Sequence, residues 1–223
     1  MLKDAPLTTV DDAKRAICEL GRRFYAQGWV SGTGGGISIR VDDRVVMAPS
    51  GVQKELLAPE DMFLLDLEGR VVERPASSTL KVSECRPLFH LAFTRRDAGA
   101  VIHSHSERAL LATLLVDDAV TFTHLEMMKG LRGVSYHDTH AVPVVENTAE
   151  ERDLESALRE AMDAHPKAHA VLVRRHGVYV WGKDWREAKR HAECYDYLFG
   201  VTVEMKRLGL DPSRPPTPAP SAR

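Results

Sequence analysis

The stretch Ala100-Val101-Ile102-His103-Ser104-His105 combines an apolar run with two histidines spaced two residues apart, and the expected fold is built around it. The apolar residues 100–102 predict a buried strand. Residues i and i+2 of a strand point to the same face, about 6.6 Å apart along the chain. His103 and His105 can therefore converge on one cation while Ser104 faces away. The pair would lie at the carboxyl end of its strand, where sites in α/β proteins usually form.

A second predicted strand supplies a third candidate ligand. Residues 171–173 read Val-Leu-Val, and the chain continues as Arg174-Arg175-His176-Gly177, where the glycine frees the backbone to turn. Three histidines with an open fourth position are the layout of a catalytic zinc site, whereas a structural site is closed by four protein ligands. A His-x-His pair alone is weak evidence, because the chain has 10 histidines and the other seven lack comparable spacing.

Hydrophobic periodicity and turn residues on either side of these strands predict a chain that mixes helices and strands, which indicates an α/β fold. The polar run 9–12 offers capping side chains to the first helix. The expected helices cover residues 10–27, 87–94, 106–115, 150–165 and 185–208. The expected strands cover residues 37–41, 44–48, 62–67, 100–105, 120–124, 140–145 and 170–173.

The length of 223 residues fits one α/β domain, which we expect over residues 1–210. The last segment reads DPSRPPTPAPSAR. Its five prolines and few apolar residues predict a disordered tail over residues 211–223.

Composition limits the kinds of partner. Charged residues make up 28% and apolar residues 43%, and the net charge of −2 gives no electrostatic case for nucleic acid, so the expected partner is a small molecule. No apolar run approaches the roughly 18–20 residues that cross a bilayer, and the N-terminus lacks the apolar core of a signal peptide. We therefore expect no membrane contact and a cytoplasmic protein. Cys18, Cys85 and Cys194 form no CxxC pair and are expected to be reduced thiols.

Two further features have both a functional and a structural interpretation. The glycine-rich loop 31–36 and the turn Pro49-Ser50-Gly51 can present backbone amides to an anion, or can be tight turns without a ligand. Neither matches a nucleotide-binding fingerprint. Glu126 follows the predicted strand 120–124 and is either a solvated glutamate or the proton carrier that a three-histidine zinc site needs.

The motifs together resemble the class II aldolase/adducin family over about residues 10–212. The resemblance rests on SGTGGGIS (31–38), APSGVQK (48–54), AVIHSHS (100–106) and VLVRRHGVYVWG (171–182). A closer resemblance, to a dehydratase branch of the family, adds PEDMF (59–63), THLEMMKG (123–130), PVVENT (143–148) and ECYDYLF (193–199).

The resemblance implies a three-layer α/β/α domain around a central, mainly antiparallel sheet, assembled as a homotetramer with active sites near the subunit contacts. It places one zinc ion per subunit on His103, His105 and His176, and the catalytic acid/base on Glu126. The implied substrate is a phosphorylated ketose. Its contacts would come from Cys85, Gly34, Gly35, Ser50, Gly51, Ser106 and Lys129.

One position departs from the sugar aldolases of the family. Those enzymes carry a glutamate near this point as base or metal ligand, whereas alignment on residues 89–93 puts Cys85 there. The departure favours removal of water from the ketose phosphate over an aldolase reaction at the same metal. Glu84 is adjacent, so a shift of one residue would restore a carboxylate, and Cys85 would then be a small buried hydrophobe. A non-catalytic adducin-like module is a third alternative, disfavoured because all three histidines are retained.

Overall fold

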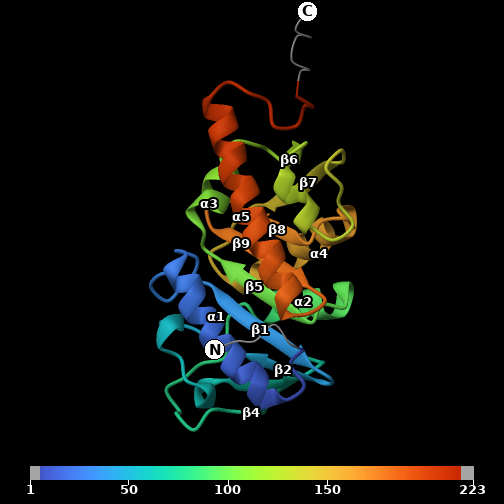
Figure 1. The fold of residues 1–223 in the computed structure, drawn as a ribbon. Helices are drawn as coiled ribbons and strands as arrows, with labels where there is room; N and C mark the ends of the chain where they lie inside the picture. The colour runs from blue at the N-terminus through green and yellow to red at the C-terminus, as the bar shows by residue number, and fades with distance from the viewer. Residues whose placement is uncertain (1–5, 217–223) are drawn as a thin grey trace, which may run out of the picture.

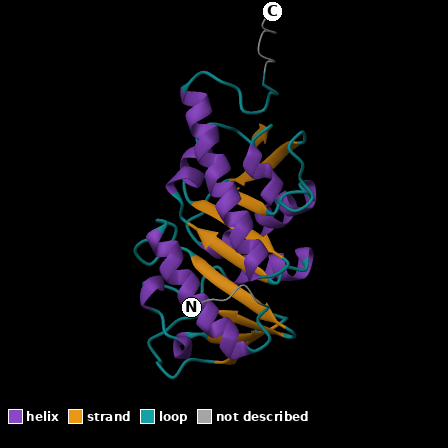
Figure 2. Ribbon diagram, viewed as in Figure 1, coloured by secondary structure: helices purple, strands orange, loops and turns teal. Residues whose placement is uncertain are grey.

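The computed structural model describes residues 6–216, in which a nine-stranded sheet carries helices on both faces (Figure 1). Figure 2 separates the strands from the helices that cover them. The helices are α1 (Val10–Ala26), α2 (Arg86–Arg96), α3 (Glu107–Ala112), α4 (Glu155–Ala164) and α5 (Trp185–Arg207), with short 3-10 segments η1 (Lys54–Leu56), η2 (Pro59–Asp61), η3 (Glu126–Gly130) and η4 (Glu151–Leu154). The strands are β1 (Gly36–Val41), β2 (Arg44–Met47), β3 (Phe63–Asp66), β4 (Val71–Glu73), β5 (Ala100–Ser104), β6 (Ala119–Thr123), β7 (Thr139–Val145), β8 (Ala170–Val173) and β9 (Gly177–Gly182).

The sheet has the order β4-β3-β2-β1-β5-β9-β8-β7-β6, and every neighbouring pair is antiparallel except β7 and β8. This confirms the mainly antiparallel α/β class. The sequence prediction had no strand over β4 or β9. All six residues of β9 are buried, so its sequence has no polar–apolar alternation to detect. The short β4 lies at the sheet edge with two of its three residues exposed.

Two separate hydrophobic cores establish the three layers. Helices α1, α3 and α5 pack on one face of the sheet, and helices α2 and α4 pack on the other. Strand β5 contributes to both cores, because Ala100 and Ile102 point into the first and Val101 into the second. His103 follows the alternation of Val101, so its ring lies on the side of α2 and α4.

Strand direction decides which loops can meet. Strand β5 runs antiparallel to β9, β9 runs antiparallel to β8, and β8 runs parallel to β7. The carboxyl ends of β5, β7 and β8 therefore lie at the same edge of the sheet, together with the amino end of β1. Strand β6 runs antiparallel to β7, so the segment that follows it starts at the opposite edge. We call the edge where β5, β7 and β8 end the ligand edge, and the opposite one, where β6 ends, the far edge.

The chain continues past α5 in contact with the sheet. Pro212 is buried, and its carbonyl oxygen accepts a hydrogen bond from the backbone N–H of Thr123 at 3.0 Å. Residues 217–223 of the predicted tail lie outside the described residues. Between residues 6 and 216, no helix combines the length and the hydropathy that spanning a membrane requires.

A buried histidine in the core makes the stability depend on pH. His140 Nε2 lies 3.0 Å from the hydroxyl oxygen of Tyr195, and burial lowers the pKa of His140 to about 4. The unfolded chain takes up this proton near pH 6.5, before the folded chain does, so folding stability falls as the pH drops from 6.5 towards 4.

Between pH 7 and pH 5, we expect the free energy of unfolding to fall by about 2 kcal/mol less in His140→Gln than in the wild type. The reason is that glutamine at this position takes up no proton when the chain unfolds. Urea unfolding at both pH values measures the difference. His137→Gln, at an exposed position, is the matched control. If the wild type and His140→Gln lost the same stability between pH 7 and pH 5, His140 would not be the source of the pH dependence.

Candidate metal centre

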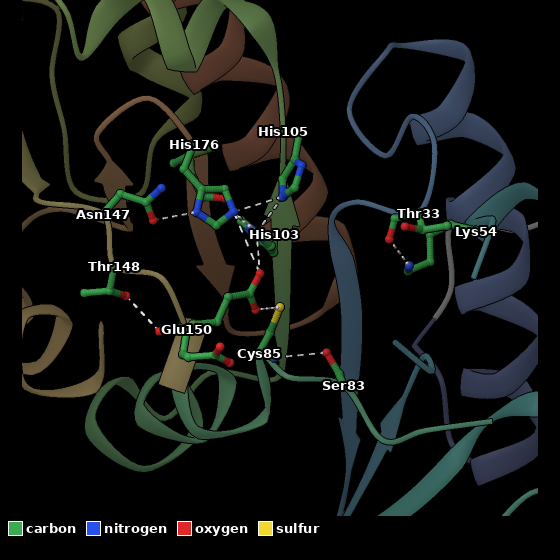
Figure 3. Close-up of polar contacts among 12 residues, drawn as sticks. Thr33, Lys54, Ser83, Cys85, His103, His105, Asn147, Thr148, Glu150 and His176 are labelled. Atoms are coloured by element: carbon green, nitrogen blue, oxygen red, sulfur yellow. Dashed lines mark hydrogen bonds and ion pairs between the residues drawn. The ribbon is translucent and has the colours of Figure 1, made fainter. Parts of the chain in front are cut away.

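Three histidines from distant parts of the chain meet at the ligand edge (Figure 3). His103 lies in β5, His105 directly follows that strand, and His176 lies in the turn between β8 and β9. Strands β5 and β9 are paired so that His103 stands opposite Tyr179, and the two rings stack with centroids 4.0 Å apart. The sheet register therefore fixes the position and the tilt of the most buried histidine.

The three imidazoles point their Nε2 atoms at one another. The Nε2–Nε2 distances are 3.0 Å between His103 and His105, 3.1 Å between His105 and His176, and 3.2 Å between His103 and His176. Zinc–nitrogen bonds of about 2.0–2.1 Å in a tetrahedral site place two nitrogens about 3.3 Å apart. The spacing is therefore close to that of three ligands around one ion.

The opposite ring nitrogens fix the protonation of two of these histidines. Nδ1 of His103 donates to the carbonyl oxygen of Val178 at 3.2 Å, and Nδ1 of His176 donates to Oδ1 of Asn147 at 3.1 Å. A neutral ring that carries its proton on Nδ1 has a lone pair on Nε2, and here that lone pair points towards the other two histidines. Two lone pairs facing each other repel unless a cation lies between them, so the donor set fits a divalent metal ion.

Burial keeps the rings neutral and able to bind metal. It lowers the pKa of His103 well below the usual value, and it lowers the pKa of His105 to about 4, with a further contribution from the neighbouring His176. Burial also lowers the pKa of His176. Because metal binding requires neutral imidazole, these shifts favour occupancy at neutral pH.

The structure adds a carboxylate that the sequence prediction missed. Glu151 opens η4 after β7, and its Oε1 lies 3.8 Å from Nε2 of both His103 and His176. Within the described residues, Glu151 and the three histidines form a group of potential metal ligands whose atoms lie within 4.8 Å of one another. The signal that could have found it is its place after β7, a strand that ends at the same edge as β5.

Cys85, a predicted substrate contact, holds this carboxylate. Its thiol donates to Oε2 of Glu151 at 2.7 Å, and Cys85 is only 4% exposed. Burial, followed by the charge of Glu151, raises the pKa of the thiol, so Cys85 remains a protonated donor. Glu84 is exposed, so the carboxylate beside the histidines comes from η4 and not from the residue next to Cys85.

The glycine-rich loop lies directly against the histidines. A β-carbon at Gly34 would stand 2.4 Å from Nδ1 of His105, so any side chain there would displace the ring. Gly35 has φ +69°, and a β-carbon there would stand 2.8 Å from the carbonyl oxygen of His103. Both predicted contacts are therefore part of the packing that positions the candidate ligands His103 and His105.

A buried lysine joins the glycine-rich loop to the turn that contains Ser50 and Gly51. Nζ of Lys54 donates to the carbonyl oxygens of Thr33 at 3.1 Å and Val52 at 3.0 Å, and Lys54 is 1% exposed (Figure 3). No carboxylate among the described residues forms an ion pair with it. The two predicted anion-binding segments thus share one buried positive charge, which the sequence prediction did not identify.

Three predicted site residues do not join the histidines within one chain. Glu126 and Lys129 lie in η3 at the far edge, where Nζ of Lys129 is 2.9 Å from Oε2 of Glu126 and the Glu126 side chain is 75% exposed. Ser106 caps α3 and donates to Asp196 of α5. Its hydroxyl is engaged in packing two helices.

Comparison with known proteins agrees with this geometry. The family model described as "Class II Aldolase and Adducin N-terminal domain" matches residues 15–203, so the chain belongs to this family. The chain is 53% identical over 211 residues to the methylthioribulose-1-phosphate dehydratase of Gallus gallus, covering 91% of this chain and 87% of the relative. It is 51% identical over 208 residues to the dehydratase of that name from Homo sapiens, with 90% and 86% covered.

Solved structures share the fold. An L-fuculose 1-phosphate aldolase superposes with a TM-score of 0.75 at 22% identity, covering 92% of this chain and 91% of that one. YgbL from Escherichia coli, titled a putative aldolase/epimerase/decarboxylase, gives a TM-score of 0.73 at 20% identity, with 88% and 90% covered.

Gly34→Ala tests the packing of the loop against His105. We expect the variant to bind Zn²⁺ at least tenfold more weakly, about 1.4 kcal/mol, because the added methyl group displaces one ligand. Competition with a chromophoric chelator measures the affinity. Ser31→Ala, at an exposed position of the same loop, should bind as the wild type does. Unchanged affinity in Gly34→Ala would show that the ring has room to move.

Proposed function

We propose that this chain is a hydro-lyase that dehydrates 5-methylthioribulose 1-phosphate to 2,3-diketo-5-methylthiopentyl 1-phosphate, a step of methionine salvage. The observation that carries the proposal is the convergence of three neutral histidines in a chain 51–54% identical, over most of its length, to relatives named for this activity. We further propose one zinc ion per subunit and a cytoplasmic homotetramer.

The metal would be held by His103, His105 and His176. When bound, a divalent ion supplies Lewis acidity that polarises the C2 ketone and acidifies the proton on C3. The protein supplies the rest: Val178 and Asn147 orient two of the rings, and Gly34 keeps the loop close to the third.

The substrate phosphate would lie between the glycine-rich loop and the turn at Ser50 and Gly51. Backbone amides in such loops bind phosphate oxygens, and Gly51, at φ +67°, has open space where a side chain would be. Lys54 ties the two segments together and forms no ion pair with any residue between 6 and 216. Its charge favours an anionic ligand over a neutral sugar at this position.

Glu126 is proposed as the acid that protonates the departing C4 hydroxyl. Glu126 follows β6 and lies at the far edge of the sheet. The strands β9, β8 and β7 separate β6 from β5, which carries His103. Within one chain Glu126 cannot reach the histidines. The role therefore requires that Glu126 of one subunit lie at the metal centre of another, which the proposed homotetramer would allow.

An aldolase is the rival function, since the same three histidines would serve it. The relatives named as dehydratases favour removal of water, as does Cys85 at the position where the sugar aldolases carry a glutamate.

The direct test is incubation of the zinc-loaded protein with the methylthio-ketose phosphate, and separately with dihydroxyacetone phosphate plus an aldehyde. We expect loss of water and formation of a diketone from the first substrate, followed by mass spectrometry, and no carbon–carbon bond formation from the second. Carbon–carbon bond formation from the second mixture, without dehydration of the first substrate, would support the aldolase and reject the proposal.

Mixing two inactive variants tests whether Glu126 acts across subunits. Glu126→Gln should lower kcat at least about 100-fold with zinc retained, and His105→Ala should lose the metal. Random co-assembly leaves about a quarter of the sites with an intact histidine set from one chain and an intact glutamate from another. Co-expressed, separately tagged chains should therefore recover about a quarter of wild-type activity. A mixture as inactive as its parents would place Glu126 outside the reaction or in its own subunit's site.

A further inference from the structure

Among the described residues, Glu151 is the one acidic group that lies with the three histidines, and the acid role proposed for Glu126 leaves the Glu151 carboxylate unused. Its side chain is 26% exposed, so it is accessible to a ligand that enters the site. Its Oε2 accepts the hydrogen bond from Cys85, and its Oε1 remains directed towards His103 and His176. One oxygen is thus anchored and the other faces the position where a substrate would bind.

We propose that Glu151 is the base that removes the C3 proton of the substrate. The inference rests on the proposed dehydratase function and deepens it. The C3 carbon of a ketose bound at a metal ion held by the three histidines would lie within a few ångströms of their Nε2 atoms. Oε1 of Glu151 is 3.8 Å from two of these nitrogens. A small movement would therefore bring it to about 3–3.5 Å from C3, the separation that proton transfer needs.

Removal of the C3 proton and loss of the C4 hydroxyl need no reagent besides these side chains and solvent. The C3–H bond breaks, the proton goes to Oε1 of Glu151, and the C3–H electron pair forms the double bond between C2 and C3 while the π pair of the C2 carbonyl moves onto the C2 oxygen. When the C4–O bond breaks, the C2 carbonyl re-forms and the pair between C2 and C3 shifts to form a double bond between C3 and C4. The hydroxyl leaves with the C4–O electron pair and becomes water by taking a proton from the separate acid. The C3 enol that results gains a proton at C4 and loses its hydroxyl proton to give the diketone. Glu151 returns its proton to solvent and the acid takes one up from solvent, so each turnover releases one water and leaves the enzyme unchanged.

The position of the two carboxylates supports this division of roles. Glu151 lies at the ligand edge of its own chain, whereas Glu126 lies at the far edge. In a homotetramer they would approach a substrate from different subunits, which suits one group that takes a proton and another that donates one. Cys85 is a positioning residue here, since its thiol fixes the rotamer of the base.

Hydrogen exchange at C3 separates the two roles. The protein is loaded with zinc and incubated in D₂O with the methylthio-ketose phosphate, and the recovered substrate is analysed by NMR. Glu126→Gln should still exchange the C3 proton while forming little diketone. Glu151→Gln should slow both the exchange and the dehydration at least about 100-fold, because the base is missing.

Glu150→Gln is the matched control, since this neighbouring side chain is exposed and belongs to no ligand group in the described structure. It should exchange and dehydrate as the wild type does. Zinc content and zinc affinity of Glu151→Gln, measured by elemental analysis and chelator competition, should equal those of the wild type.

Two results would overturn the proposal. C3 exchange at the wild-type rate in Glu151→Gln would assign the base elsewhere, and loss of zinc from that variant would make Glu151 a metal ligand. Absence of dehydration by the wild-type protein would instead reject the proposed function, so the two failures are distinguishable.

Discussion

The convergence of three imidazole nitrogens within 3.0–3.2 Å is the constraint on which the rest of the structure depends. The protons on Nδ1 of His103 and His176 are committed to Val178 and Asn147, so the facing Nε2 atoms present lone pairs to each other. Such an arrangement is favourable only around a cation. The close approach of the glycine-rich loop, the stacked Tyr179 ring and the pairing of β5 with β9 all maintain this geometry.

Sheet topology divides the molecule into two functional edges. Segments leaving β5, β7 and β8, and the segment entering β1, meet at one edge and bring the histidines, Glu151 and the glycine-rich loop together. The far edge carries η3 with Glu126 and Lys129. A reaction that uses residues from both edges therefore needs more than one copy of the chain. The proposed homotetramer would then be required for catalysis.

The charges at the ligand edge suit an anionic substrate. A divalent ion and the buried ammonium of Lys54 would carry three positive charges, and Glu151 would offset one of them. A phosphate group supplies close to the remaining two. Neutral histidines contribute nothing to this sum, because burial suppresses their protonation. The net charge of −2 for the whole chain does not reveal this local excess.

Local patterns in the sequence were sufficient for the α/β class, the main helices and the candidate ligands His103, His105 and His176, because strand periodicity and motif spacing are short-range properties. Strand β9 was not predictable, since uniform burial leaves no alternation. Only the tertiary structure decided that Cys85 contacts Glu151, 66 residues away, and that Lys54 is buried on backbone carbonyl oxygens. Strand direction places a side chain at one edge of the sheet or the other, and direction follows from how distant strands pair, which no local pattern contains.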